Sequence, residues 1–259
     1  MRRRVWMMGW LPIISLMGTR RMRVAMGIMV LNMVYVAGKF GQAAQFNGVS
    51  TYIQVAHNDN LNLQHLTLVA WVYDYHHSGT SLILLKGNWS SGGPQKRQYE
   101  FSSTYGEQEI VNFGLLNAHN MDWEWIKSTS NIAIEQWKHI VATYDGKIQK
   151  LYIDGSLDSA RTVSFEAFIP HAPEPLTIGA GFTDDQWVGI KNGLIDDLRL
   201  YNRALSECEI QSLYEGTEKC GGFTLHKQTL MPPTSKVLKM VPQPVRSLAL
   251  ANRQSCHQT

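Results

Sequence analysis

The chain has 259 residues, of which 44% are hydrophobic and 17% charged, and its formal net charge is +3. Its length fits one domain of about 180 residues with flanking tails. Residues 41–220 hold 12 lysines and arginines against all 21 acidic residues, so this part carries a net charge near −9. Because a nucleic-acid-binding domain needs a basic folded surface, the balance argues against nucleic acid as a partner.

Residues 1–37 contain two short apolar runs, each preceded by a group of arginines. This order is typical of a signal peptide, yet neither run reaches the roughly 18–20 residues of a membrane span. Three interpretations stay open: a signal or membrane anchor, an uncleaved helix at the membrane surface, and a wrongly placed start of the chain. Membrane contact, if any, is expected only through this segment.

Short strands separated by turns are predicted from residue 45 to residue 201. Alternating polarity indicates strands over 45–55 and 139–144, and a continuous apolar run indicates a buried strand over 82–85. Asp145-Gly146 is a typical hairpin turn. Many short strands punctuated by glycine favour an all-β fold, an antiparallel sandwich of two sheets.

Residues 192–214 predict one strand that leads directly into one short helix. Strict alternation places four side chains on one face of this strand, namely Leu194, Asp196, Leu198 and Leu200. Ser206 is predicted to begin the helix, because Glu209 three residues later completes a capping box. From residue 221 to residue 259 the chain loses periodicity and gains proline, which predicts a disordered basic tail.

Five segments together resemble a known family. They are GKFGQAAQFNGVSTYIQV (38–55), LTLVAWVY (66–73), WKHIVATYDGKIQKLYIDG (137–155), LTIG (176–179) and NGLIDDLRLYNRALSECEIQSLY (192–214). Their content and order resemble the laminin-G-like jelly roll of the concanavalin A-like lectin/glucanase superfamily. The resemblance implies a jelly-roll sandwich over residues 38–220, with one short C-terminal helix, in a secreted or cell-surface protein.

The resemblance also implies a structural Ca²⁺ ion at one rim of the sandwich. The corresponding ligand positions here are Asn47 in the opening motif and Asp196 in the last strand. Calcium prefers six to eight oxygen ligands, several of them anionic. Asn47 and Thr51 are neutral where the family has acids, so any binding is expected to be weak. The alternative is that Asp196 or Asp197 makes an ordinary hydrogen bond at the rim.

Aromatic side chains in or beside the expected loops suggest a carbohydrate-binding surface, because the C–H faces of sugars stack on aromatic rings. The candidates are Trp89, Tyr105, Trp123, Trp125 and Trp187. The segment MDWEWI (121–126) is the densest case, and its two tryptophans share one strand face. The alternative is that this tryptophan pair belongs to the core.

Catalysis is not favoured by the pattern of acids. Glycosidases need two carboxylates across a cleft, and the hydrolase branch of the superfamily carries E-x-D-x-E on one strand. The pairs Glu107/Glu109 and Asp122/Glu124 each lack the third member.

Three cysteines are present. Cys208 and Cys220 could close a loop of about 12 residues by a disulfide in an oxidising compartment, or both could be free thiols. Cys256 would be left over.

The sequence therefore predicts a non-enzymatic extracellular recognition module that binds a carbohydrate or a protein partner through rim loops, with Ca²⁺ as a candidate cofactor. Two alternatives stay open: a glycoside hydrolase or polysaccharide lyase of the same fold, and a structural domain of an adhesin or surface protein.

Overall fold

The computed structural model describes residues 5–7, 14–17, 28–31, 33–75, 79–88, 96–104, 109–117, 122–163, 173–183 and 186–217. All of them lie in one compact unit, residues 1–226. Residues 227–259, which include most of the predicted tail, lie outside this description.

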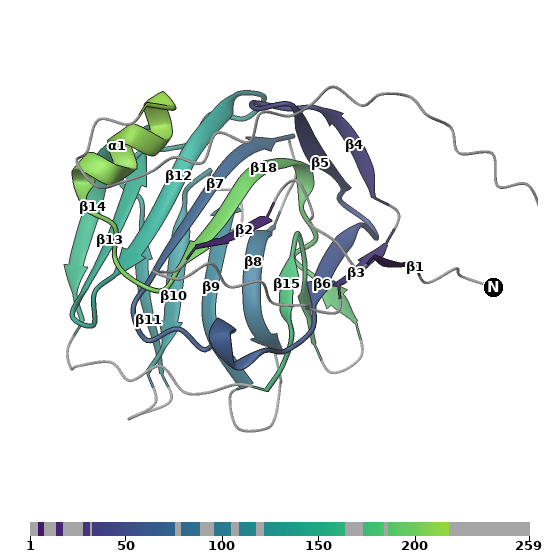
Figure 1. Ribbon diagram of the computed structural model, residues 1–259, viewed down its shortest axis with the longest axis horizontal. Helices are drawn as coiled ribbons and strands as arrows, with labels where there is room; N and C mark the ends of the chain where they lie inside the picture. The colour runs from purple at the N-terminus through teal and green to yellow at the C-terminus, as the bar shows by residue number, and fades with distance from the viewer. Residues whose placement is uncertain are drawn as a thin grey trace, which may run out of the picture. The chain divides into compact units, whose positions relative to one another are not determined.

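Two large sheets form a sandwich (Figure 1). Sheet A contains, in hydrogen-bonded order, β1 (Val5–Met7), β3 (Ile28–Leu31), β6 (Tyr52–Val55), β15 (Leu176–Ile178), β8 (Ser81–Asn88), β9 (Lys96–Thr104), β10 (Asn112–Leu116) and β11 (Trp123–Lys127). Sheet B contains β14 (Ser156–Thr162), β13 (Ile148–Ile153), β12 (Trp137–Tyr144), β7 (Leu66–Asp74), β18 (Asn192–Tyr201), β5 (Gln42–Asn47) and β4 (Val34–Ala37). Neighbouring strands on these two paths run antiparallel.

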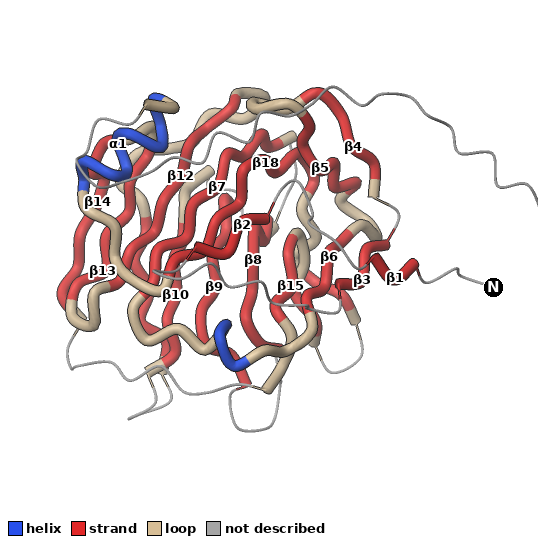
Figure 2. Tube along the Cα trace, in the orientation of Figure 1, coloured by secondary structure: helices blue, strands red, loops and turns tan. Residues whose placement is uncertain are grey.

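The other elements are short. β2 (Ile14–Met17) pairs with β18 in parallel, and β16 (Gly181–Phe182) pairs with β17 (Trp187–Val188) as a small separate hairpin. Within the described residues, helical structure is confined to η1 (Asp59–Leu61) and α1 (Glu207–Glu215) (Figure 2). The predicted all-β jelly-roll sandwich with one C-terminal helix is confirmed.

Apolar side chains from both sheets meet in one core. Representative members are Phe46, Leu68 and Ile140 from sheet B and Phe101 and Phe113 from sheet A, all fully buried. Complete burial of each such side chain contributes about 1.5–3 kcal/mol to folding. Successive side chains of a strand point to opposite faces of its sheet. The residues between these core positions therefore lie on the outer face.

The last strand departs from the strict alternation expected of it. A register shift lies between Asp196 and Arg199, and Asp197 adopts a left-handed backbone with φ of 47°. This bulge reverses the side-chain direction, so Leu198 joins Ile195 in the core while Asp196 stays on the outer face. The prediction that Asp196 and Leu198 share a face is therefore wrong, because one extra residue interrupts the pleat.

Helix α1 covers part of the outer face of sheet B (Figure 1). Ile210 and Leu213 of the helix pack against Val69, Val141 and Tyr201 of the sheet. The helix begins as predicted, since Ser206 Oγ accepts from the Glu209 N–H in a complete capping box. It ends at Gly216, whose φ of 66° is the left-handed value that favours glycine.

Strands also occur inside the segment 1–37. β4 pairs with β5 at the edge of sheet B, and β3 pairs with β6 in sheet A. The paired strands therefore begin upstream of residue 38, which is the residue at which the sequence alone places the start of the domain.

The capping box gives a pH-dependent prediction. Hydrogen bonding to Arg203 lowers the pKa of Glu209 from its ordinary 4.5 to about 2. The folded state thus binds fewer protons than the unfolded chain between these two pH values, so this stabilisation is complete above about pH 4.5 and is lost as pH falls towards 2.

Glu209→Gln should lower the free energy of unfolding by about 1–2 kcal/mol at neutral pH, and by much less near pH 2. Urea unfolding across this range measures the difference, with Glu207→Gln on the same helix as the control. If Glu209→Gln lowers the free energy of unfolding equally at neutral pH and near pH 2, the ionised Glu209 carboxylate is not the source of this stabilisation.

Candidate functional site

The outer face of sheet A is divided into a covered half and an aromatic, polar half. The β16–β17 hairpin lies against the first half, where Trp187 stacks on Tyr52 of β6 with 3.6 Å between ring centroids and also contacts Phe182 at 5.0 Å. Gly181 and Gly189 lie against Leu82 of β8. Trp187, predicted to bind sugar, thus packs the hairpin onto the sheet.

Trp123 and Trp125 lie together on β11, at the free edge of the other half. Their rings stack with centroids 5.0 Å apart and an interplanar angle of 23°. Both are half-buried and face outward, because the intervening strand positions point toward the core: Ile126 packs there with Phe113 of the neighbouring strand. The sequence therefore places this pair correctly on one strand face, and the structure excludes it from the inter-sheet core.

The two rings rest on a position without a side chain. Gly114 of β10 pairs with Trp125, and a Cβ atom built there would lie 2.6 Å from Trp125 and 2.8 Å from Trp123. Contacts that short do not occur between real Cβ atoms and carbon, so any other residue would displace the rings.

A cation continues the stack beyond Trp123. The Arg97 guanidinium lies 4.5 Å from the centroid of the Trp123 ring and 3.8 Å from the Glu100 carboxylate. Arg97 and Trp125 both contact the Trp123 ring, so the three groups form one stack. Both faces of Trp123 are therefore covered, one by Arg97 and one by Trp125.

Polar side chains form the floor beside the tryptophans. Glu100, Ser102 and Asn112 point outward from β9 and β10, yet each is at least 97% buried. In this described part of the chain, Ser102 Oγ, Asn112 Oδ1 and Trp123 Nε1 make no hydrogen bond. Such buried unpaired atoms are rare in native proteins and often mark a place for water or a ligand. These residues are not among the predicted site residues, although the alternating polar residues of 98–102 are a signal.

Side chains from sheet B hold the tryptophan strand in place. Arg161 of β14 donates to the Trp125 carbonyl at 2.6 Å and forms an ion pair with Glu124. Ser159 Oγ donates to the Lys127 carbonyl at 3.0 Å, and Asp158 accepts from the N–H groups of Thr129 and Ser130. These contacts satisfy backbone groups that an edge strand otherwise leaves to solvent.

The same contacts separate the acids of this region. Glu124 pairs in register with Leu115 on the core-facing row, whereas Glu100 lies on the outer row with Gly114. Each carboxylate has its own arginine, Arg161 and Arg97 respectively. The described acids of β9–β11 thus do not face each other across a cleft; Glu107 lies outside the described residues.

Asn47 and Asp196, the predicted calcium ligands, do not share a site. Asn47 pairs with Asn192, four residues from Asp196 along β18, or about 13 Å. The Asn47 side-chain oxygen accepts from three backbone N–H groups, those of Val49, Ser50 and Thr51.

Asp196 is 2% exposed and accepts from the N–H groups of Phe40 and Asp197 at 2.8 and 2.7 Å. Burial is the main cause that raises its pKa. Within the described ranges, no three His, Cys, Asp or Glu side chains gather closely enough to hold a metal ion. These residues therefore do not fit a shared calcium site.

The remaining predicted residues are only partly described. Trp89, Tyr105 and Cys220 lie outside the described residues. Cys208, on α1, is disulfide-bonded, and its partner also lies outside them. The pairing of Cys208 with Cys220 therefore stays a prediction. In the part of the chain that is described, no helix is long and apolar enough to cross a membrane.

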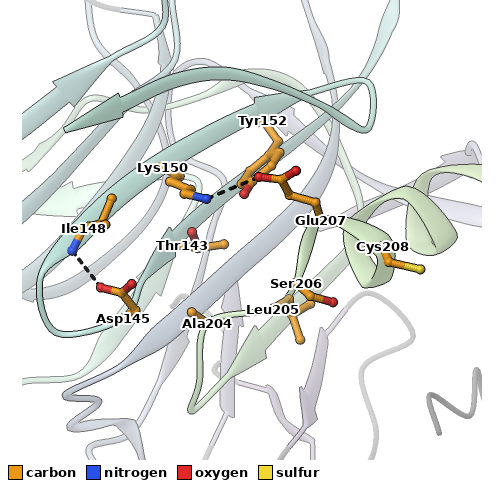
Figure 3. Close-up of a pocket in the computed structure, with 10 residues that line it drawn as sticks. All are labelled: Thr143, Asp145, Ile148, Lys150, Tyr152, Ala204, Leu205, Ser206, Glu207 and Cys208. Atoms are coloured by element: carbon orange, nitrogen blue, oxygen red, sulfur yellow. Dashed lines mark hydrogen bonds and ion pairs between the residues drawn. The ribbon is translucent and has the colours of Figure 1, made fainter. Parts of the chain in front are cut away.

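A pocket of 440 Å³ lies on the outer face of sheet B, between the β12–β13 hairpin and the start of α1 (Figure 3). Lys150 and Glu207 face each other across it with 3.3 Å between Nζ and Oε1. Asp145 accepts from the N–H of Ile148 in the hairpin turn. These lining charges already have partners within the protein, so the pocket is a weaker candidate than the tryptophan face.

The sequence matches a family model described as concanavalin A-like lectin/glucanases superfamily, of laminin G type, over residues 47–211. The chain belongs to this family. No curated protein matches it.

Several solved structures share the fold. The binding domain of Paraclostridial Mosquitocidal Protein 1 is 16% identical with a TM-score of 0.57, over 74% of this chain and 48% of that chain. The botulinum neurotoxin serotype G binding domain is 14% identical with a TM-score of 0.55, over 74% and 46%. Domain 4 of AbnA, an extracellular GH43 arabinanase from Geobacillus stearothermophilus solved with arabinotriose, is 21% identical with a TM-score of 0.54, over 71% and 81%. The matched region thus spans about half of each toxin domain.

The hydrogen bonds of Asp196 predict its effect on stability. Asp196→Asn replaces one accepting oxygen by an NH₂ group that cannot accept, so the free energy of unfolding should fall by about 1–2 kcal/mol. Thermal unfolding should show the same loss in calcium chloride and in EDTA. If EDTA destabilises the wild-type protein and not the variant, Asp196 binds calcium and this account of it is wrong.

The contact between β14 and β11 gives a second prediction. Arg161→Gln leaves the buried Glu124 carboxylate without its cation and should cost about 1–3 kcal/mol, since Arg161 is partly exposed. The double variant Arg161→Gln/Glu124→Gln should recover part of that loss in urea unfolding. An unchanged unfolding midpoint in the single variant contradicts the role of Arg161 in holding β11.

Proposed function

We propose that this protein is a non-enzymatic extracellular recognition module that binds carbohydrate on the outer face of β9–β11. The observation that carries the proposal is the stacked pair Trp123–Trp125 beside buried polar atoms for which the described residues supply no hydrogen-bond partner. Carbohydrate sites combine these features, because an apolar sugar face stacks on an aromatic ring while the hydroxyl groups need hydrogen-bond partners.

The comparisons support a binding role at the level of the fold. The toxin structures are titled binding domains, and the AbnA domain was solved with arabinotriose. A shared fold does not establish a shared ligand, so the proposal depends on the site itself. The site also differs from the sequence-based expectation, since Trp123 and Trp125 lie on a strand at the sheet edge and not in rim loops.

An extracellular location is part of the proposal. The disulfide bond of Cys208 favours an oxidising compartment, and the arabinanase among the similar structures is titled extracellular. The separate arginine partners of Glu100 and Glu124 favour binding over hydrolysis, because a glycosidase needs two carboxylates on either side of one bond.

A glycan array with the full chain tests the proposal. Trp125→Ala should abolish the signals, because it removes the accessible ring. Trp137→Ala should retain them, since Trp137 is a half-buried tryptophan of sheet B that packs on Tyr73 at 5.6 Å.

Three outcomes contradict the proposal. Release of new reducing ends from bound polysaccharide indicates an enzyme. Binding to extracellular proteins without any glycan signal indicates a protein partner. A cooperatively folded protein that binds neither indicates a structural domain.

A further inference from the structure

We infer that the tryptophan face holds a single sugar ring against Trp125 and does not bind a run of consecutive sugars. This inference rests on the proposed function and specifies the ligand: a terminal or isolated monosaccharide unit. It follows from how many aromatic faces the stack leaves open and from where the unpaired polar atoms lie.

Among the described rings and cations, only one indole face of the stack lacks a stacking partner. Trp123 has Arg97 against one face and Trp125 against the other. Trp125 has Trp123 against one face, and no other ring or cation of the described residues stacks on it. A second sugar therefore finds no second aromatic platform among the described residues of this strand.

On the side of Trp125 away from Trp123, strand register places the next outward-facing row of residues. Trp125 pairs with Gly114, and Lys127, two residues further along β11, pairs with Asn112. Asn112 in turn pairs with Ser102 of β9. Two residues of a strand span about 7 Å. That distance leaves room for one sugar ring stacked on Trp125, but not for two.

The floor of that row offers the hydrogen bonds that one sugar needs. Asn112 Oδ1 is an acceptor and Ser102 Oγ is both a donor and an acceptor, and neither atom has a hydrogen-bond partner among the described residues. Both atoms are buried, a state that is unfavourable unless another group hydrogen-bonds to them. A ring that stands on its edge against Trp125 directs adjacent hydroxyl groups at these two oxygens.

Chain-length dependence of binding tests the inference. The probes are the methyl glycosides of glucose, galactose, mannose, fucose, arabinose and xylose, with the di- and trisaccharides of each. Calorimetry on the full chain should give association constants for a binding monosaccharide and its trisaccharide within about threefold of each other. A rise of about tenfold with each added sugar overturns the inference and leaves the proposed function intact. No binding of any probe overturns both.

Two substitutions locate the subsite. Ser102→Ala and Asn112→Ala should each weaken monosaccharide binding by about tenfold or more. Neither oxygen has a partner within the described part of the chain, so Ser102→Ala should leave the thermal midpoint unchanged or raised, which a purely structural hydroxyl would not do.

Asn62→Ala is the matched control, because Asn62 also has a buried unpaired Oδ1 but follows η1, beside Leu61 in the inter-sheet core. If both Ser102→Ala and Asn112→Ala keep full monosaccharide affinity, these two residues do not form the subsite. The same conclusion follows if Asn62→Ala loses as much affinity as they do.

Discussion

The candidate site depends on the absence of a side chain at residue 114. The rings of Trp123 and Trp125 occupy the space that a Cβ atom would need, and their mutual stacking follows from resting on the same position. Arg97 and Trp125 then cover both faces of Trp123, so a single aromatic face is left for a ligand. One glycine in a central position of a strand, normally unfavourable, thereby makes room for both tryptophan rings.

That geometry also needs a fixed edge strand. β11 ends sheet A, and the backbone groups on its free side would otherwise be open to water or to another chain. Arg161, Ser159 and Asp158 of β14 occupy that side with hydrogen bonds to β11 and the residues after it. The two sheets are thus joined by side chains at this edge as well as by the apolar core between them. These contacts hold the strand that carries the Trp125 ring. Binding therefore needs to order fewer groups, which lowers its entropic cost.

The sequence predicted what local patterns determine. Ser206 and Glu209 identify the start of α1, and alternation in β11 places Trp123 and Trp125 on one face. Strict alternation failed at Asp197, because a bulge has no reliable signature in one sequence. Ser102 and Asn112 were missed because strand register, not composition, brings them beside Trp125. The hydrogen bond between Arg161 and Trp125 joins residues 36 apart on different sheets, and no local pattern predicts it.

The central claim is that the open face of Trp125, with Asn112 and Ser102, receives a sugar. A crystal structure of the protein with the methyl glycoside that binds most tightly tests this claim most directly. We expect one ring at a stacking distance of about 4 Å from the Trp125 indole, with hydroxyl groups bonded to Asn112 Oδ1 and Ser102 Oγ. A sugar bound elsewhere, for example in the pocket between α1 and the β12–β13 hairpin, with the Trp125 face unoccupied, would contradict the account.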